Sequence, residues 1–108
     1  MYEYDILVSM RFLSKAQGGG RSNLPPIKDN EYSYRPIFRL EKDTIGYCCG
    51  IVIGGYIENY NFDTELLNIK VLFLQFSAIK NKLYVGKKFK LFEGNMLIGT
   101  GQILKIKE

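Results

Sequence analysis

The chain has 108 residues, which is enough for one domain with a single hydrophobic core and too few for two. Apolar residues make up 46% of it and aromatic residues 14%, a composition that excludes an intrinsically disordered chain. The net charge of +4 is unevenly placed, because residues 1–69 sum to −2 and residues 70–108, with eight lysines, sum to +6. We therefore expect one globular domain over residues 1–108 with a basic carboxy-terminal third.

Alternation of apolar and polar side chains with period 2 recurs along the chain and predicts β-strands. In chain order the expected strands are 4–13, 34–40, 45–53, 68–77 and two more within 86–106. The run 68–77 is nearly continuous in apolar residues, as in a strand covered on both faces. The segment 14–26 is rich in glycine and proline and predicts a loop, 56–67 is irregular, and 78–85 is a short connection with a brief strand or turn. No segment keeps a helical apolar stripe for three turns, so the predicted class is all-β, a barrel or sandwich.

The last third of the chain predicts a β-hairpin. Two apolar runs flank Glu93-Gly94-Asn95, a turn signal whose glycine is free to adopt a positive φ. Gly99 and Gly101 are two residues apart, so on a strand they share one face and remove side chains from it. Such a gap indicates a barrel corner or a close approach of two backbones.

Cellular location follows from what the sequence does not contain. No amino-terminal segment has the basic start and apolar run of a signal peptide, and no apolar run is long enough to span a membrane. Cys48 and Cys49 are adjacent, so on a strand they point to opposite faces, and we expect one buried thiol and one outward thiol rather than a disulfide or metal site. We expect a cytoplasmic protein without membrane contact.

Catalysis has little support in the residue types. The chain has no histidine, so it lacks the usual general base and the commonest metal ligand. It also lacks the Gly-x-x-x-x-Gly-Lys-Ser/Thr phosphate loop, and the glycines 18–20 precede no helix and lysine that would turn them into a phosphate cradle. We expect no enzyme activity, no catalytic or metal-binding residues, no cofactor and no nucleotide binding.

Several motifs in order resemble the third, carboxy-terminal β-barrel domain of elongation factor Tu and related translational GTPases. They are Gly19-Gly20-Arg21 after the first strand, Tyr34-Arg35-Pro36 before Phe38, Asn68-Ile69-Lys70, Phe89 to Gly94 with its Glu-Gly turn, and Ile98-Gly99-Thr100-Gly101. The resemblance covers essentially the whole chain. It implies a six-stranded antiparallel Greek-key β-barrel.

In that family the domain helps to grip aminoacyl-tRNA, and the resemblance implies where a partner would bind. The residues predicted to bind a partner, chosen from the family motifs or for their positive charge, are Gly19, Gly20, Arg21, Arg35, Lys87, Lys88, Lys90 and Gly94. Polar RNA contacts of the family are replaced here, since Ile37 stands where the family has glutamine and Ile45 where threonine is usual. We therefore expect only weak, salt-sensitive RNA binding and a protein as the main partner.

The predicted function is a non-catalytic binding module for a protein or RNA partner, with a role linked to translation as one version of it. Two alternatives remain: an immunity-type protein that binds and blocks a toxin domain, and a structural subunit of a larger assembly. The eight lysines of the carboxy-terminal third also have a plain interpretation, because lysines on strands keep exposed sheet surfaces soluble and unpaired.

Overall fold

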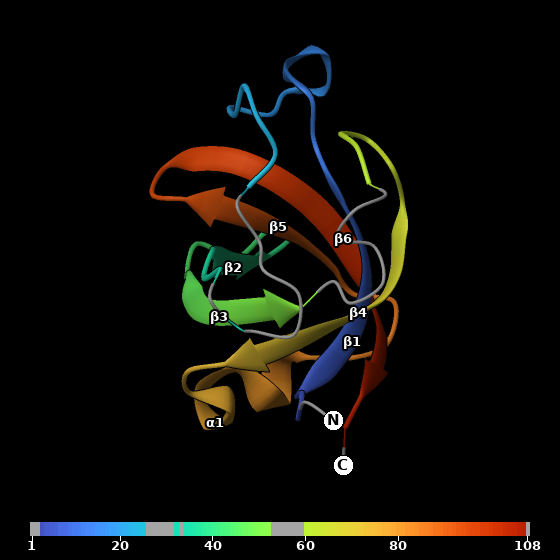
Figure 1. Ribbon diagram of the computed structural model, residues 1–108. Coiled ribbons are helices and arrows are strands. Elements are labelled where there is room, and N and C mark those ends of the chain that lie inside the picture. Colours follow the sequence, from blue (N-terminus) through green and yellow to red (C-terminus); the bar gives the residue numbers. More distant parts are fainter. Residues whose placement is uncertain (1–2, 26–31, 33, 53–59, 108) are drawn as a thin grey trace.

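Six strands and a few short helical turns make up the part of the chain that the computed structural model describes, residues 3–25, 32, 34–52 and 60–107 (Figure 1). The strands are β1 (Ile6–Phe12), β2 (Ile37–Leu40), β3 (Tyr47–Val52), β4 (Leu66–Phe73), β5 (Lys88–Glu93) and β6 (Met96–Ile106). The helical turns are η1 (Lys15–Gln17), α1 (Phe76–Ile79) and η3 (Lys80–Lys82). Within the described residues, no helix has the length and apolar content needed to cross a membrane.

The strands close into a barrel in the order β1-β4-β3-β2-β5-β6, with β6 returning to β1. Every neighbouring pair is antiparallel. β2, β3 and β4 follow one another as neighbours, β5 and β6 form a hairpin, and the connections from β1 to β2 and from β4 to β5 cross to non-adjacent strands. The expected all-β class and the closed six-stranded antiparallel barrel are confirmed.

The core consists of inward side chains from all six strands, sealed by residues such as Ile79 of α1. Its centre is aromatic: the Phe38 ring stacks on Phe89 at 4.5 Å between centroids and meets Phe73 edge-on at 4.9 Å. Such pairs are favourable beyond the area that they bury.

Glycines let β6 pass close to its neighbours, as the sequence predicted. A Cβ on Gly99 would lie 2.8 Å from the carbonyl oxygen of Arg11, and one on Gly101 would lie 2.3 Å from that of Ser9 and 2.5 Å from the Phe89 ring. No side chain fits at such distances. The eleven-residue β6 therefore pairs with both β1 and β5, with one register shift in each ladder, and it ends beside the start of β1 (Figure 1).

The strand predicted over 68–77, covered on both faces, corresponds to β4, but its bounds and its burial differ from the prediction. β4 begins at Leu66, two residues before the predicted start. The prediction missed this start because Asn68, with a positive φ of 57°, forms a bulge that interrupts the alternation. It ends at Phe73, and residues 76–79 form a helical turn too short to leave a periodic signal. Only one face is buried, and the Leu74 side chain just beyond the strand is 71% exposed.

The other predicted elements are shorter than expected or incompletely described. In the predicted strand 34–40, Tyr34 makes only an isolated bridge to Ile51, and β2 begins after Pro36, which has no N–H to donate. The connection 78–85 holds helical residues and no strand. Pro26, Ile53 and the first part of the irregular segment 56–67 lie outside the described residues.

Candidate binding surfaces

The loop after β1 is folded down onto the β5–β6 hairpin, and its glycines make this possible. The Gly20 N–H donates to the carbonyl oxygen of Leu97 at 2.8 Å. A Cβ on Gly19 would lie 2.0 Å from the carbonyl oxygen of Leu13, and one on Gly20 would lie 2.1 Å from Cγ of Met96. Two of the predicted contact residues, Gly19 and Gly20, thus have a clear role in loop packing.

A charged cluster ties this loop to the hairpin turn. Nη1 of Arg21 donates to both carboxylate oxygens of Glu93, at 2.7 and 2.8 Å, and the Tyr34 hydroxyl donates to the same carboxylate. The Arg21 and Glu93 side chains are each about a quarter exposed, at 24% and 27%. We call these three residues the Arg21–Glu93–Tyr34 cluster; it brings two distant predicted motifs together.

Gly94 completes the hairpin beside this cluster. Glu93 pairs with Met96 across a two-residue loop, and φ is positive at Gly94 (61°) but not at Asn95. That pattern fits a type II′ turn, in which the first central residue is preferably glycine. The structure therefore places Arg21 and Gly94 at the same end of the hairpin, where Arg21 binds Glu93 and Gly94 forms the turn.

Burial and the hydrogen bond to Glu93 raise the pKa of the Tyr34 hydroxyl well above its ordinary value of 10.0. Below about pH 10 the hydroxyl is protonated in both the folded and the unfolded chain, so it adds no pH dependence. Above that pH the unfolded chain loses the proton while the folded chain keeps it, and rising pH favours unfolding. We expect urea denaturation to show stability falling more steeply between pH 9.5 and 11.5 in wild type than in Tyr34→Phe. Equal slopes would show that Tyr34 ionises as readily in the fold as in the unfolded chain.

Positive side chains line up across the outer surface of four strands. Arg39 on β2 is paired with Lys90 on β5, Lys90 with Thr100 on β6, and Thr100 with Arg11 on β1. Their side chains point outward, because the intervening residues Leu40, Phe89 and Met10 are buried in the core. Neighbouring strands are about 4.8 Å apart, so three cations share one short row.

A second row extends this surface. Lys88 on β5 is paired with Gln102 on β6, which is paired in turn with Ser9 on β1. We define the basic face as the outward side chains Arg11, Arg39, Lys88 and Lys90 with Ser9, Thr100 and Gln102 between them. The strands β1, β2, β5 and β6 contain one carboxylate, Glu93, and Arg21 neutralises it. Within these four strands the basic face is therefore almost uncompensated.

Arg39 is held firmly in this face. Its guanidinium lies 4.1 Å from the centroid of the Phe92 ring, a cation–π contact that covers an aromatic side chain only 9% exposed. Its Nε is buried and has no hydrogen-bond partner in the described part of the chain. Like charges opposite each other on paired strands are unfavourable, so Arg39 and Lys90 are placed at a cost to stability.

Two acidic groups border the basic face. Asp63 accepts hydrogen bonds from Ser14, which lower its pKa, and the nearby charge of Arg11 is a lesser cause in the same direction. Glu41 lies with Lys42, Tyr84, Gly86, Lys87 and Lys88 around a hollow of about 290 Å³ at one end of the face. Lys87 lies over the Tyr84 ring at 5.2 Å, so it belongs to this end rather than to the rows.

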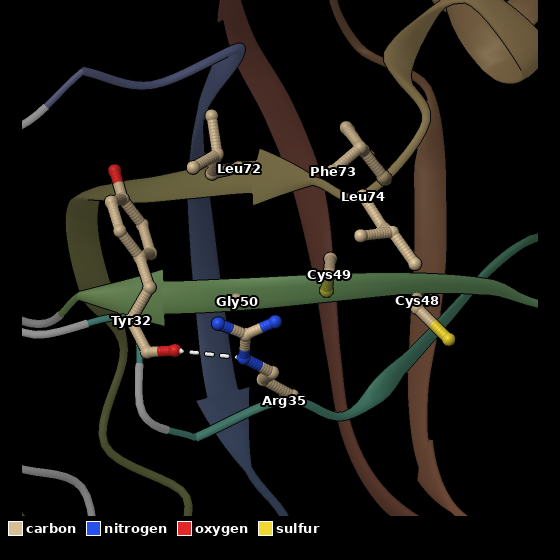
Figure 2. A pocket seen from close by; sticks show the side chains of 8 residues that line it. All are labelled: Tyr32, Arg35, Cys48, Cys49, Gly50, Leu72, Phe73 and Leu74. Atoms are coloured by element: carbon tan, nitrogen blue, oxygen red, sulfur yellow. Dashed lines mark hydrogen bonds between the residues drawn. The ribbon is translucent and has the colours of Figure 1, made fainter.

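The predicted lysines and Arg35 do not form one site. Lys88 and Lys90 share the basic face with Arg11 and Arg39, two residues that the sequence prediction missed because their neighbours depend on strand order. Arg35 instead lines a hollow of about 310 Å³ over β3 and β4 (Figure 2).

The two cysteines are arranged as predicted. Cys48 is exposed, Cys49 is buried, and both are free. Burial raises the pKa of the Cys49 thiol far above its ordinary value, which leaves it in the unreactive protonated form. Among the described residues, no group of three or more histidine, cysteine, aspartate or glutamate side chains is placed to hold a metal ion.

The sequence was compared with protein-family models and with curated proteins. No protein-family model matches the sequence, and no curated protein matches it. The resemblance to the elongation factor barrel therefore stays a prediction from the sequence motifs.

Proposed function

We propose that this chain is a non-catalytic binding module with the Greek-key fold of the elongation factor Tu carboxy-terminal barrel, and that it binds an acidic protein surface through its basic face. The strand order supports the fold, because three consecutive neighbours and two crossing connections are typical of a Greek key. Contact between the Gly-Gly-Arg loop and the Glu-Gly turn supports it further, since two motifs of the resemblance meet in space.

The observation that carries the proposal is the row formed by Arg39, Lys90 and Arg11. Strand pairing places Arg39 directly beside Lys90 and puts Arg11 on the far side of Thr100 in the same row, and no carboxylate lies between them. An anionic surface laid across the row would relieve their repulsion, and electrostatic complementarity of this kind sets specificity and association rate.

The face suits an acidic protein better than RNA. Single-stranded RNA binds where bases stack on exposed aromatic rings, but Phe92 is covered by Arg39. Ile37, also on the outer side of β2, offers no hydrogen bond to a ribose or phosphate. Phosphate contacts alone position a nucleic acid weakly and are lost as salt rises. We therefore expect tRNA binding that is weak, indifferent to aminoacylation and removed by physiological salt.

Charge reversal on the face tests the proposal. The tagged domain should capture a partner with an acidic surface from its own cells, and Lys88→Glu/Lys90→Glu should reduce the captured amount at least tenfold. Lys15→Glu/Lys80→Glu is the matched control, since these exposed lysines lie on helical turns and not on the strands of the face, and the net charge changes equally. Quantitative mass spectrometry with and without ribonuclease is the measurement. Capture that ribonuclease abolishes would assign the face to RNA, and equal loss in both variants would show that it is not a specific surface.

A further inference from the structure

A second surface, remote from the rows of the basic face, lies over β3 and β4. Its hollow is bounded by Tyr32, Arg35, Cys48, Leu72 and Leu74, with the buried Cys49 and Phe73 beneath (Figure 2). Leu72 and Leu74 both line the hollow, and Leu74 is 71% exposed. The lining is thus mainly apolar and open to solvent.

A glycine shapes the floor of this hollow. A Cβ on Gly50 would lie 2.9 Å from the Cβ of Tyr32, so the bare backbone at Gly50 lets Tyr32 stand close over β3. Tyr32 lies at one end of the hollow and Leu74 at the other, with Leu72 between them along β4 (Figure 2). The resulting gap is large enough for one or two apolar side chains.

Arg35 brings a positive charge into this apolar lining. Its Nε donates to the carbonyl oxygen of Tyr32 at 3.2 Å, and the guanidinium lies over Gly50 (Figure 2). This bond fixes the side chain and leaves the terminal nitrogens facing the hollow. Ion pairs in the described part of the chain join Arg21 to Glu93 and Lys82 to Asp43, and none involves Arg35.

The hollow continues along β3. A neighbouring hollow of about 210 Å³ is lined by Gly46, Tyr47 and Gln75, and it shares Cys48 and Leu74 with the first. We call the two together the β3–β4 groove. A small molecule would fill one hollow, whereas an extended chain would lie across both.

We propose that the β3–β4 groove binds an extended peptide segment of a protein partner, with an aliphatic side chain between Tyr32 and Leu74 and a neighbouring carboxylate on Arg35. Arginine presents paired N–H donors that match the two oxygens of a carboxylate. Surrounding apolar side chains lower the local dielectric and strengthen that pair. The groove is a different surface from the basic face, so either can exist without the other.

Nuclear magnetic resonance titration of the ¹⁵N-labelled domain tests the groove directly. The probes are three capped hexapeptides in which leucine alternates with glutamate, glutamine or lysine. The glutamate peptide should shift the amide signals of Gly46, Cys48, Gly50, Leu72 and Leu74. It should bind about tenfold more tightly than the glutamine peptide, since a charge-assisted bond to Arg35 contributes about that factor, and the lysine peptide should bind least.

Variants separate the two contacts. Arg35→Gln should reduce binding of the glutamate peptide to the level of the glutamine peptide and leave the latter unchanged. Leu74→Ser should weaken both peptides, whereas Leu104→Ser, an exposed leucine on β6 outside the groove, should weaken neither. Lys88→Glu/Lys90→Glu should leave peptide binding intact, which keeps this result separate from the test of the basic face.

Three results would overturn the inference. The first is a glutamate peptide that shifts only signals of β5 and β6, because the basic face would then account for its binding. The second is equal binding of all three peptides, which would remove the role of Arg35. The third is 4-methylpentanoate, which carries the same aliphatic and carboxylate groups, binding as tightly as the peptide, because the site would then be a small-molecule pocket.

Discussion

Gly101→Val is expected to destabilise the barrel by about 3 kcal/mol, the upper end of what overpacking usually costs. The new Cβ would meet the carbonyl oxygen of Ser9 at 2.3 Å and the Phe89 ring at 2.5 Å. Ser9 is part of the β1–β6 ladder, so its carbonyl cannot move without breaking strand pairing. Phe89 is buried and stacked on Phe38 at the centre of the core, so its ring cannot move without disturbing that close packing. Urea denaturation of the two proteins measures the difference.

Thr100→Val is the matched control for this substitution. Thr100 is the preceding residue of β6, but its side chain lies on the outer face, so the same valine should change stability by less than about 0.5 kcal/mol. A Gly101→Val protein as stable as wild type would mean that β6 does not approach β1 and β5 as closely as its backbone indicates.

Glu93→Ala is expected to cost about 2 kcal/mol, because it removes hydrogen bonds to a charged group and leaves two partly buried donors without their acceptor. Those donors are the Arg21 guanidinium, whose Nη1 lies 2.7 and 2.8 Å from the two carboxylate oxygens of Glu93, and the Tyr34 hydroxyl. The loss should also loosen the loop after β1, since Arg21 ties it to the hairpin. Trypsin should then cleave after Arg21 faster in the variant than in wild type.

Asn95→Ala tests whether the effect comes from the carboxylate or merely from changing the turn. Asn95 is exposed, and among the described contacts its side chain makes no hydrogen bond. The Asn95→Ala substitution should leave both the free energy of unfolding and the rate of trypsin cleavage after Arg21 unchanged. If Glu93→Ala behaved in the same way as Asn95→Ala, the Arg21–Glu93–Tyr34 cluster would not tether the loop.

The sequence by itself determined the strand content, the hairpin and its turn. Period-2 alternation records which side of a strand is buried, and a glycine between two apolar runs records a turn; both signals lie within a few residues. The glycine spacing of β6 was equally informative, because Gly99 and Gly101 could only share a face. The same local rule separated the buried Cys49 from the exposed Cys48.

The sequence prediction was wrong where local signals were absent. The helical turn 76–79 has four residues, less than the length at which an apolar stripe can be recognised. The bulge at Asn68 shifts the pattern in β4 by a residue and displaces the predicted start of the strand. The exposure of Leu74, just beyond β4, was also missed, because an apolar residue looks the same in a sequence whether covered or exposed.

Only the tertiary structure decided which side chains form surfaces. Arg11, Arg39 and Lys90 lie on three different strands, and the order in which the barrel closes brings them into one row. Arg21 and Glu93 are 72 positions apart, and their contact exists because the loop folds onto the hairpin. Arg35 is separated from the lysines because it lies over β3 and β4. Pairing between distant segments depends on the summed fit of the whole core, and that information is not written in any short stretch of the chain.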